Sequence, residues 1–349
     1  MSEKMDLSGH PRVLLGNLPT PLEHLPRLSQ FIGGPEIYVK RDDCTGLAFG
    51  GNKVRKLEFL MGDALSRKAT TIVTMGTVQS NHPPLTAAAA CKLGLSCELV
   101  LENRVAIDDI EYHRSGNPFL NRLYGASTHI VSIGADAAAA LKSVADEVRQ
   151  RGEIPYIIPR GGSTPVGALG YVQCASEILD QAEHEALSFD YIVHATASAG
   201  TQSGLLVGLK AMGYDTPVIG IGVNASESVQ TQRVFDLACE TADYLGKPGL
   251  VTRDDVIANC DYVGAGYGLV SRDMNASLLQ VARLEGLLLD PVYSGKCMAG
   301  LIDLTRKGLF ASARNILFIH TGGVPALFGY REQLFDSLSE KNTGQLNED

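Results

Sequence analysis

Residues 70–93 read TTIVTMGTVQSNHPPLTAAAACKL, which is a short apolar run, a turn of small and polar residues, and an alanine-rich stretch. The run at 70–75 is apolar on both faces, as a buried parallel strand must be. The stretch at 85–93 has the composition of a helix. A strand, a turn and a helix in this order form the repeating unit of an α/β fold.

The same order repeats along the chain. A strand followed by a helix is expected at 36–40 and 55–68, 97–101 and 117–124, 129–132 and 136–151, 156–159 and 166–183, 191–195 and 201–212, and 217–222 and 227–245, with a further strand at 315–320. The sequence therefore predicts an α/β fold with parallel sheets. Because so many strands usually divide into two packed units, we expect two lobes with a cleft between them.

Length, composition and charge limit the class of protein. A chain of 349 residues with 45% hydrophobic and 20% charged residues can bury a sizeable core. The 30 Lys and Arg against 39 Asp and Glu give a net charge of −9, so we expect no nucleic-acid partner.

The chain also lacks signs of export, membrane insertion or metal binding. Residues 1–15 have no cationic start followed by an apolar run, and no stretch approaches the roughly 20 apolar residues that span a bilayer. We therefore expect a cytoplasmic protein with no membrane partner. The seven cysteines are odd in number and have no CxxC pair, which predicts reduced thiols and no metal site.

Ligands of open parallel sheets bind beyond the carboxyl ends of strands, so the turns before helices are the places to search. In Gly50-Gly51-Asn52-Lys53, two glycines precede a lysine at a helix start. Lysine is the residue that forms Schiff bases, and Lys53 could reach into a cleft. The alternative is a solvated basic helix start formed by Lys53, Arg55 and Lys56.

Two further turns are suited to anions. Ser80 and Asn81 can cap the helix that follows them, whose free N–H groups would face a substrate carboxylate, although capping alone is the alternative. The turn Ser198-Ala199-Gly200-Thr201 has small residues that let backbone N–H groups approach a phosphate, and tight packing explains it equally well.

A fourth region carries two tyrosines. Tyr293 lies within Asp290-Pro291-Val292-Tyr293-Ser294-Gly295-Lys296, Tyr267 lies between two glycines, and His320-Thr321-Gly322-Gly323 follows near the end of the pattern. A phenol in a cleft can act as an acid, a base or a stacking surface. A buried tyrosine bonded to the backbone is the alternative for each.

Together these motifs resemble one enzyme family, in which they occur in the same order. It is the group of fold type II pyridoxal-phosphate enzymes, tryptophan synthase β-like in fold, that comprises D-cysteine desulfhydrase, L-cysteate sulfo-lyase and 1-aminocyclopropane-1-carboxylate deaminase. The resemblance implies an α/β enzyme with parallel or mixed sheets and flanking helices. Its large cofactor domain would comprise residues 1–59 and 166–349, and its small domain residues 60–165. It also implies a small amino-acid substrate and a homodimer.

The resemblance assigns roles to individual residues. Lys53 matches the lysine that binds pyridoxal 5′-phosphate, Asn81 the contact to its 3′-hydroxyl, and Ser294 or Thr321 the hydroxyl near its ring nitrogen. The catalytic residues are then Lys53, Ser80, Tyr267 and Tyr293; the cofactor-binding residues are Lys53, Asn81, Ser198, Ala199, Gly200, Thr201, Ser294 and Thr321; the substrate-binding residues are Ser80, Asn81, His82 and Arg160.

The implied reaction is an α,β-elimination. The Lys53 amine would take the α-proton of D-cysteine or L-cysteate, and the products would be pyruvate, ammonia, and sulfide or sulfite. The chain departs from the family pattern at Pro83-Pro84-Leu85, where the family commonly has a small residue, Arg and Gln. Ser294 stands where the ring-opening deaminases have a glutamate, which favours simple elimination. Arg160 is either a surface cation or a ligand of a dianionic substrate such as cysteate.

Three other functions compete with this interpretation. The first is 1-aminocyclopropane-1-carboxylate deaminase. The second is a nicotinamide-dependent oxidoreductase, because Gly220-Ile221-Gly222-Val223-Asn224-Ala225 matches the dinucleotide pattern G-x-G-x-x-A. The third is an amino-acid-binding protein without turnover.

Overall fold

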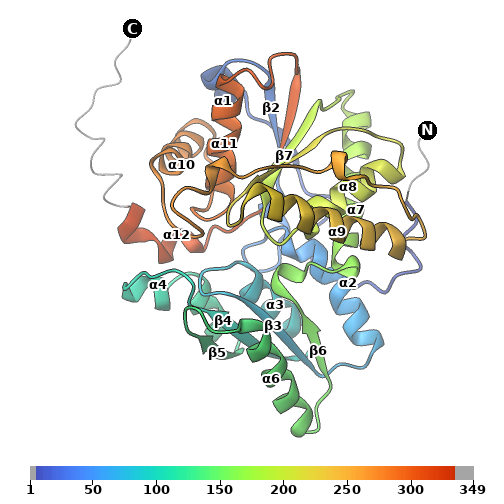
Figure 1. Ribbon diagram of the computed structural model, residues 1–349, viewed down its shortest axis with the longest axis vertical. Coiled ribbons are helices and arrows are strands. Elements are labelled where there is room, and N and C mark those ends of the chain that lie inside the picture. The colour runs from blue at the N-terminus through green and yellow to red at the C-terminus, as the bar shows by residue number, and fades with distance from the viewer. Residues whose placement is uncertain (1–4, 335–349) are drawn as a thin grey trace.

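The computed structural model describes residues 5–334, whose strands form two separate sheets (Figure 1). The larger sheet has the strand order β1-β2-β10-β7-β8-β9, and the smaller has the order β5-β4-β3-β6. Neighbouring strands are parallel except β1 and β2, which are antiparallel. The strands of the larger sheet are β1 Leu22–His24, β2 Glu36–Lys40, β7 Tyr191–Thr196, β8 Val218–Gly222, β9 Ile257–Asn259 and β10 Asn315–Ile319. Those of the smaller sheet are β3 Thr71–Thr77, β4 Ser96–Glu102, β5 Ser127–Val131 and β6 Pro155–Ile158.

Helices cover both faces of each sheet. Around the larger sheet lie α1 Pro26–Ile32, α7 Pro165–His184, α8 Gly200–Ala211, α9 Glu227–Tyr244, α10 Arg272–Glu285 and α11 Ser294–Arg306. The remaining helices are α2 Lys53–Ser66, α3 His82–Lys92, α4 Ile110–Arg114, α5 Asn117–Leu123, α6 Ala137–Gln150 and α12 Ala326–Gly329. In Figure 1, α1, α10 and α11 lie on one side of β7, and α7, α8 and α9 lie on the other. None of the helices within residues 5–334 is long and apolar enough to cross a membrane.

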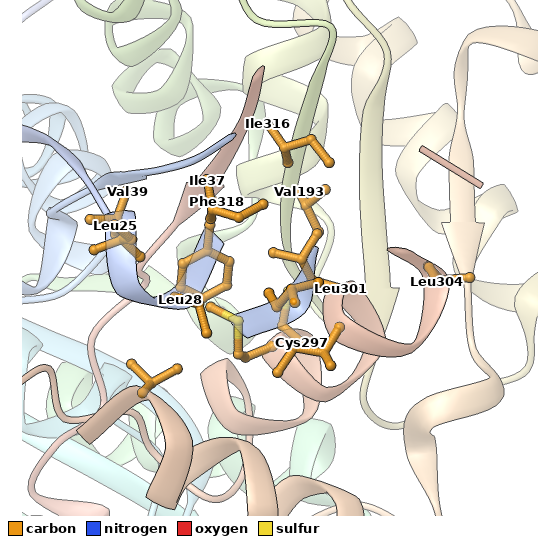
Figure 2. Close-up of a cluster of buried hydrophobic side chains, with 14 of the residues drawn as sticks. Leu25, Leu28, Ile37, Val39, Val193, Cys297, Leu301, Leu304, Ile316 and Phe318 are labelled. Atoms are coloured by element: carbon orange, nitrogen blue, oxygen red, sulfur yellow. The ribbon is translucent and has the colours of Figure 1, made fainter. Parts of the chain in front are cut away.

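The central strand β10 shows why these runs are apolar on both faces. Ile316 and Phe318 point into the cluster beneath α1 and α11, which Figure 2 shows around Leu301. Leu317 and Ile319 belong to the cluster on the opposite face, beneath α7 and α8. Successive side chains of a strand alternate between faces, so a strand covered on both sides must be apolar throughout.

The predicted fold class is confirmed, since both sheets are parallel or mixed and flanked by helices. The sequence did not predict β1, β9, α10 or α11, and the region 290–296, taken as a turn, begins α11 at Ser294. The division into domains stays a prediction, and its outermost parts, 1–4 and 335–349, lie outside the described residues. Helix α2 runs through the expected boundary at 59 and packs against both α7 and α3.

Candidate active site

A cavity of about 380 Å³ lies where carboxyl ends of strands from both sheets meet. Its walls come from the segments that follow β3, β6, β7 and β10. Eleven predicted site residues line it: Lys53, Ser80, Asn81, His82, Arg160, Ser198, Ala199, Thr201, Tyr267, Tyr293 and Thr321. The sequence argument from strand ends therefore located the cavity.

Ser294 and Gly200 are not among the lining residues. Ser294 is buried at the start of α11, where its hydroxyl donates to Asp290 Oδ1 at 2.6 Å and accepts from the Asp290 N–H at 2.7 Å. The expectation that Ser294 faces the ring nitrogen is corrected, because its hydroxyl is used to hold the helix start. Thr321, the other residue considered for that role, lines the cavity.

Lys53 is the first residue of α2, and the turn before it is tight rather than flexible. Gly50 and Gly51 have φ of 71° and 134°, which favours glycine, and a Cβ on Gly51 would lie 2.5 Å from Asn81 Nδ2. Burial lowers the pKa of the Lys53 amine from 10.5 to about 8. The alternative of a solvated basic helix start is wrong, since Arg55 and Lys56 are each 1% exposed.

Lys56 is a site residue that the sequence interpretation missed. Its Nζ donates to the Gly161 carbonyl at 3.3 Å and to Ser163 Oγ at 3.4 Å. A Cβ on Gly200 would lie 2.8 Å from this Nζ, so the amine stands at the N-terminus of α8. Burial and the neighbouring Lys53 hold the pKa of Lys56 well below its usual range. The available signal was the i, i+3 spacing from Lys53, which puts both lysines on one helix face.

The turn before α8 is open to a phosphate group. Ala199 has φ of 74°, and the Gly200 N–H donates to Ser163 Oγ at 3.1 Å. The Ser163 hydroxyl in turn donates to Ser198 Oγ at 2.9 Å. A Cβ on Gly161 would lie 2.4 Å from Ser198 Oγ, so only glycine fits the facing position. Small residues, a helix N-terminus and the Lys56 amine together form an anion cradle.

The start of α3 differs from the predicted capping. Asn81 is the N-cap but makes no side-chain cap bond, and its Nδ2 donates to the Gly50 carbonyl at 3.1 Å. Ser80 Oγ accepts from the His82 N–H at 3.3 Å. The His82 ring is buried, with Nε2 2.9 Å from Thr74 Oγ1, and its pKa lies well below the usual range because of burial and nearby cations.

The two predicted tyrosines meet over the cavity. Their hydroxyl oxygens are 2.5 Å apart, and the Tyr267 hydroxyl is also 2.9 Å from Thr77 Oγ1. The alternative of tyrosines bonded to the backbone is therefore not what is found. Burial raises the pKa of both phenols, so each stays protonated at neutral pH. The loop of Tyr267 is held by Lys296, whose Nζ donates to the carbonyls of Val263 and Gly266 at 2.6 and 2.7 Å.

Helix α2 is anchored by a buried ionic network. Arg55 donates to Asp42 Oδ1 and to Glu177 Oε1, both at 2.8 Å, and Lys40 Nζ lies 2.5 Å from the same Glu177 oxygen. These segments are far apart in the sequence, so the network was not predicted. It fixes the helix whose first residue is Lys53.

The charges of the lining residues define the ligand. The lining includes the cations Lys53, Arg104, Arg160 and Arg233, and no Asp or Glu among the described residues. A buried amine with a lowered pKa beside an anion cradle suits a cofactor that carries an aldehyde and a phosphate. Fold and site thus define a cofactor-dependent α/β enzyme, and pyridoxal 5′-phosphate has both groups.

The chain belongs to the pyridoxal-phosphate dependent enzyme family, whose sequence model matches residues 13–322. It is 45% identical over 329 residues to a D-cysteine desulfhydrase of Klebsiella pneumoniae, covering 94% of this chain and 99% of the relative. It is 44% identical over 317 residues to a 1-aminocyclopropane-1-carboxylate deaminase of Methylobacterium nodulans, covering 89% and 94%. A solved structure titled an ACC deaminase homologue matches with a TM-score of 0.85 at 39% identity, covering 95% of this chain and 97% of that one.

The glycines of the dinucleotide pattern have a different use. Gly220 and Gly222 lie in β8, where a Cβ would stand 2.3 Å from Gln202 Oε1 and 2.2 Å from Cys260 Sγ respectively. They permit close packing within the larger sheet. The interpretation as a nicotinamide oxidoreductase is therefore set aside in favour of the family.

Proposed function

We propose that this enzyme is a carbon–sulfur lyase that converts a small sulfur amino acid, D-cysteine or L-cysteate, to pyruvate, ammonia, and sulfide or sulfite. The single observation that carries the proposal is the placement of the buried Lys53 amine between an anion cradle and a pair of protonated phenols. The relatives named D-cysteine desulfhydrase, 45% identical over most of the chain, support this choice of substrate.

Residues on two sides of the cavity would hold the cofactor. Lys53 binds it covalently, and the turn 198–201 with Lys56 and Ser163 binds its phosphate. Asn81 is placed for the ring hydroxyl and Thr321 for the ring nitrogen. The bound cofactor supplies an electron sink for the carbanion that forms at the substrate Cα.

The remaining residues would move protons and position the substrate. The free Nζ of Lys53 removes the Cα proton, a role that its low pKa permits at neutral pH. Ser80, Asn81 and His82 orient the substrate from the start of α3, which lines the cavity. The Tyr293 hydroxyl, kept protonated by burial and bonded to Tyr267, donates a proton toward the departing sulfur.

The second candidate activity is that of a 1-aminocyclopropane-1-carboxylate deaminase. A relative of that name, 44% identical to this chain, favours it. Ser294 stands where the resemblance leads us to expect a glutamate for ring opening, and it is turned to Asp290. We therefore place it second, and ammonia release from 1-aminocyclopropane-1-carboxylate separates the two activities.

Cellular location and assembly complete the proposal. We place the enzyme in the cytoplasm, acting on free amino acids without a membrane or nucleic-acid partner, as a homodimer. The absence of a helix able to span a membrane within residues 5–334 is consistent with this location. Size-exclusion chromatography with light scattering tests the dimer.

The decisive experiment joins cofactor trapping to a substrate panel. Borohydride reduction of the yellow protein followed by mass spectrometry is expected to find the pyridoxyl adduct on Lys53. Pyruvate, sulfide and sulfite are then measured with D-cysteine, L-cysteine and both enantiomers of cysteate. Lys53→Ala is expected to fold and to release no pyruvate. An adduct on another lysine refutes the assigned role, and a yellow protein inert toward every substrate refutes the lyase in favour of an amino-acid-binding protein.

A further inference from the structure

The cations of the cavity are divided between its two ends. Arg233 lies at the phosphate end, where its guanidinium is 3.4 Å from the Ala197 carbonyl oxygen just before the cradle. Arg104 and Arg160 lie at the tyrosine end, and we call them the rim arginines. The Arg104 guanidinium stands 5.3 Å from the centroid of the Tyr267 ring. The Arg160 charge is close enough to His82 to contribute to the lowered pKa of that ring.

The rim arginines are incompletely neutralised. Arg160 gives one nitrogen to Glu102 Oε2 at 2.7 Å, and its side chain is 37% exposed toward the cavity mouth. Arg104 has no carboxylate within ion-pair distance among residues 5–334. A guanidinium offers five N–H donors in a fork, so each of these side chains has donors left for an anionic ligand.

Neutral donors for an anion are scarce on the facing wall. Helix α3 opens with His82, Pro83 and Pro84, and proline has no N–H group. Two of the first three backbone donors of this helix are therefore missing. Anion recognition at this end of the cavity falls to the rim arginines.

The number of positive groups exceeds what a neutral side chain requires. The cofactor phosphate is matched by Lys56, the start of α8 and Arg233. The α-carboxylate of an amino acid matches one rim arginine. A thiol at pH 7 is almost uncharged and leaves the second arginine without a partner, whereas a sulfonate is fully ionised.

We propose that Arg104 and Arg160 select substrates whose β-carbon carries an anionic sulfur group, so that the preferred substrate is a β-sulfonated amino acid rather than cysteine. The inference rests on the proposed lyase activity. In the reaction the Cα–H and Cβ–S bonds break, and the sulfur leaves as sulfite with the electron pair of the Cβ–S bond. One water is consumed, and pyruvate and ammonia complete the balance.

Matched substrate pairs isolate the charge. At pH 7, kcat/KM is measured for cysteate and cysteine of the same configuration, D with D and L with L, so that each pair differs only in sulfonate against thiol. The wild-type enzyme is expected to prefer cysteate. Arg104→Met and Arg160→Met are each expected to lower the cysteate-to-cysteine ratio by about 10- to 100-fold, the loss typical of one charge-assisted hydrogen bond to a ligand.

Two further variants serve as a counter-test and a control. Glu102→Gln frees Arg160 from its carboxylate and is expected to raise the ratio. Arg151→Met removes an arginine of the same lobe that pairs with Glu98 at 2.6 Å outside the cavity lining, and it is expected to leave the ratio unchanged. The absorbance of the lysine-bound cofactor, which a merely structural defect would alter, is expected to stay constant across the series.

The outcomes separate the inference from the proposed function. Pyruvate from cysteine with no preference for cysteate, or a ratio unchanged in both arginine variants, overturns the inference and leaves the lyase intact. Cofactor-loaded protein that releases no pyruvate from any of the four substrates overturns both. Should Arg160→Met fail to fold, the ratios of Arg104→Met and Glu102→Gln decide.

Discussion

The lowered pKa of Lys53 predicts how the apoenzyme takes up its cofactor as pH changes. Only a neutral amine attacks an aldehyde, and an ordinary lysine with a pKa of 10.5 is neutral in about one molecule in a thousand at about pH 7.5. With its pKa lowered to about 8 by burial, Lys53 is neutral in about one molecule in four at that pH. The site therefore presents about 240 times more reactive amine than a surface lysine.

The assay mixes apoenzyme with pyridoxal phosphate and follows the yellow absorbance of the lysine-bound form in a stopped-flow instrument. The rate, divided at each pH by that of N-acetyl-lysine methyl ester, removes the titration of the cofactor itself. The ratio is expected to be highest near neutral pH and to fall as pH rises above about 8, because Lys53 is then already neutral while the free amine still gains. Lys53→Ala is expected to show no uptake.

One result would refute this reasoning. If the rate ratio stays constant from about pH 7 to about pH 10, Lys53 titrates like a free amine, and burial does not prepare it for the cofactor. The cavity would then have to admit water to the amine before the cofactor arrives.

Three substitutions test other parts of the structure. Arg55→Met is expected to lower the free energy of unfolding in urea by about 3–5 kcal/mol, because it leaves Asp42 and Glu177 buried without their cation; an unchanged midpoint and slope would contradict the network. Lys296→Met leaves two carbonyl groups without a donor and is expected to cost about 1–3 kcal/mol, while kcat falls because the Tyr267 loop loosens; normal kcat would show that the loop needs no clamp. Tyr293→Phe is expected to lower kcat by about 10²- to 10⁴-fold with normal cofactor uptake, and retained kcat would remove its role as proton donor.

Local pattern was sufficient to predict most of the fold. Strands β2 and β8, covered on both faces, were apolar throughout and bounded by turn residues, so their positions followed from sequence. The edge strand β1 is only three residues long and pairs antiparallel, so it has no period to detect. Helices α10 and α11 follow stretches without a strand signal, and the expectation of a turn at 290–296 hid the start of α11.

The site was predictable where a turn follows a strand and unpredictable where a contact joins distant segments. Lys53, Ser198 and Tyr267 lie in turns of unusual composition, and the structure brings them to one cavity. Lys56 looked like a solvated cation, because its burial depends on Gly161 and Ser163, more than 100 residues away. Ser294 was misplaced because a hydroxyl at a helix start also suits a carboxylate four residues before it, and that partner prevails.

The place of β10 in the larger sheet has a consequence for the synthesis of the enzyme. This strand lies between β2 and β7, so the segments before and after it in the strand order share no hydrogen-bonded edge without it. The carbonyl of Thr321, just beyond β10, also accepts the N–H of Asn52 at 3.1 Å, immediately before the lysine. On the ribosome, an amine translated early must therefore await a backbone oxygen translated some 270 residues later, and a nascent chain becomes competent for its cofactor only as translation nears its end.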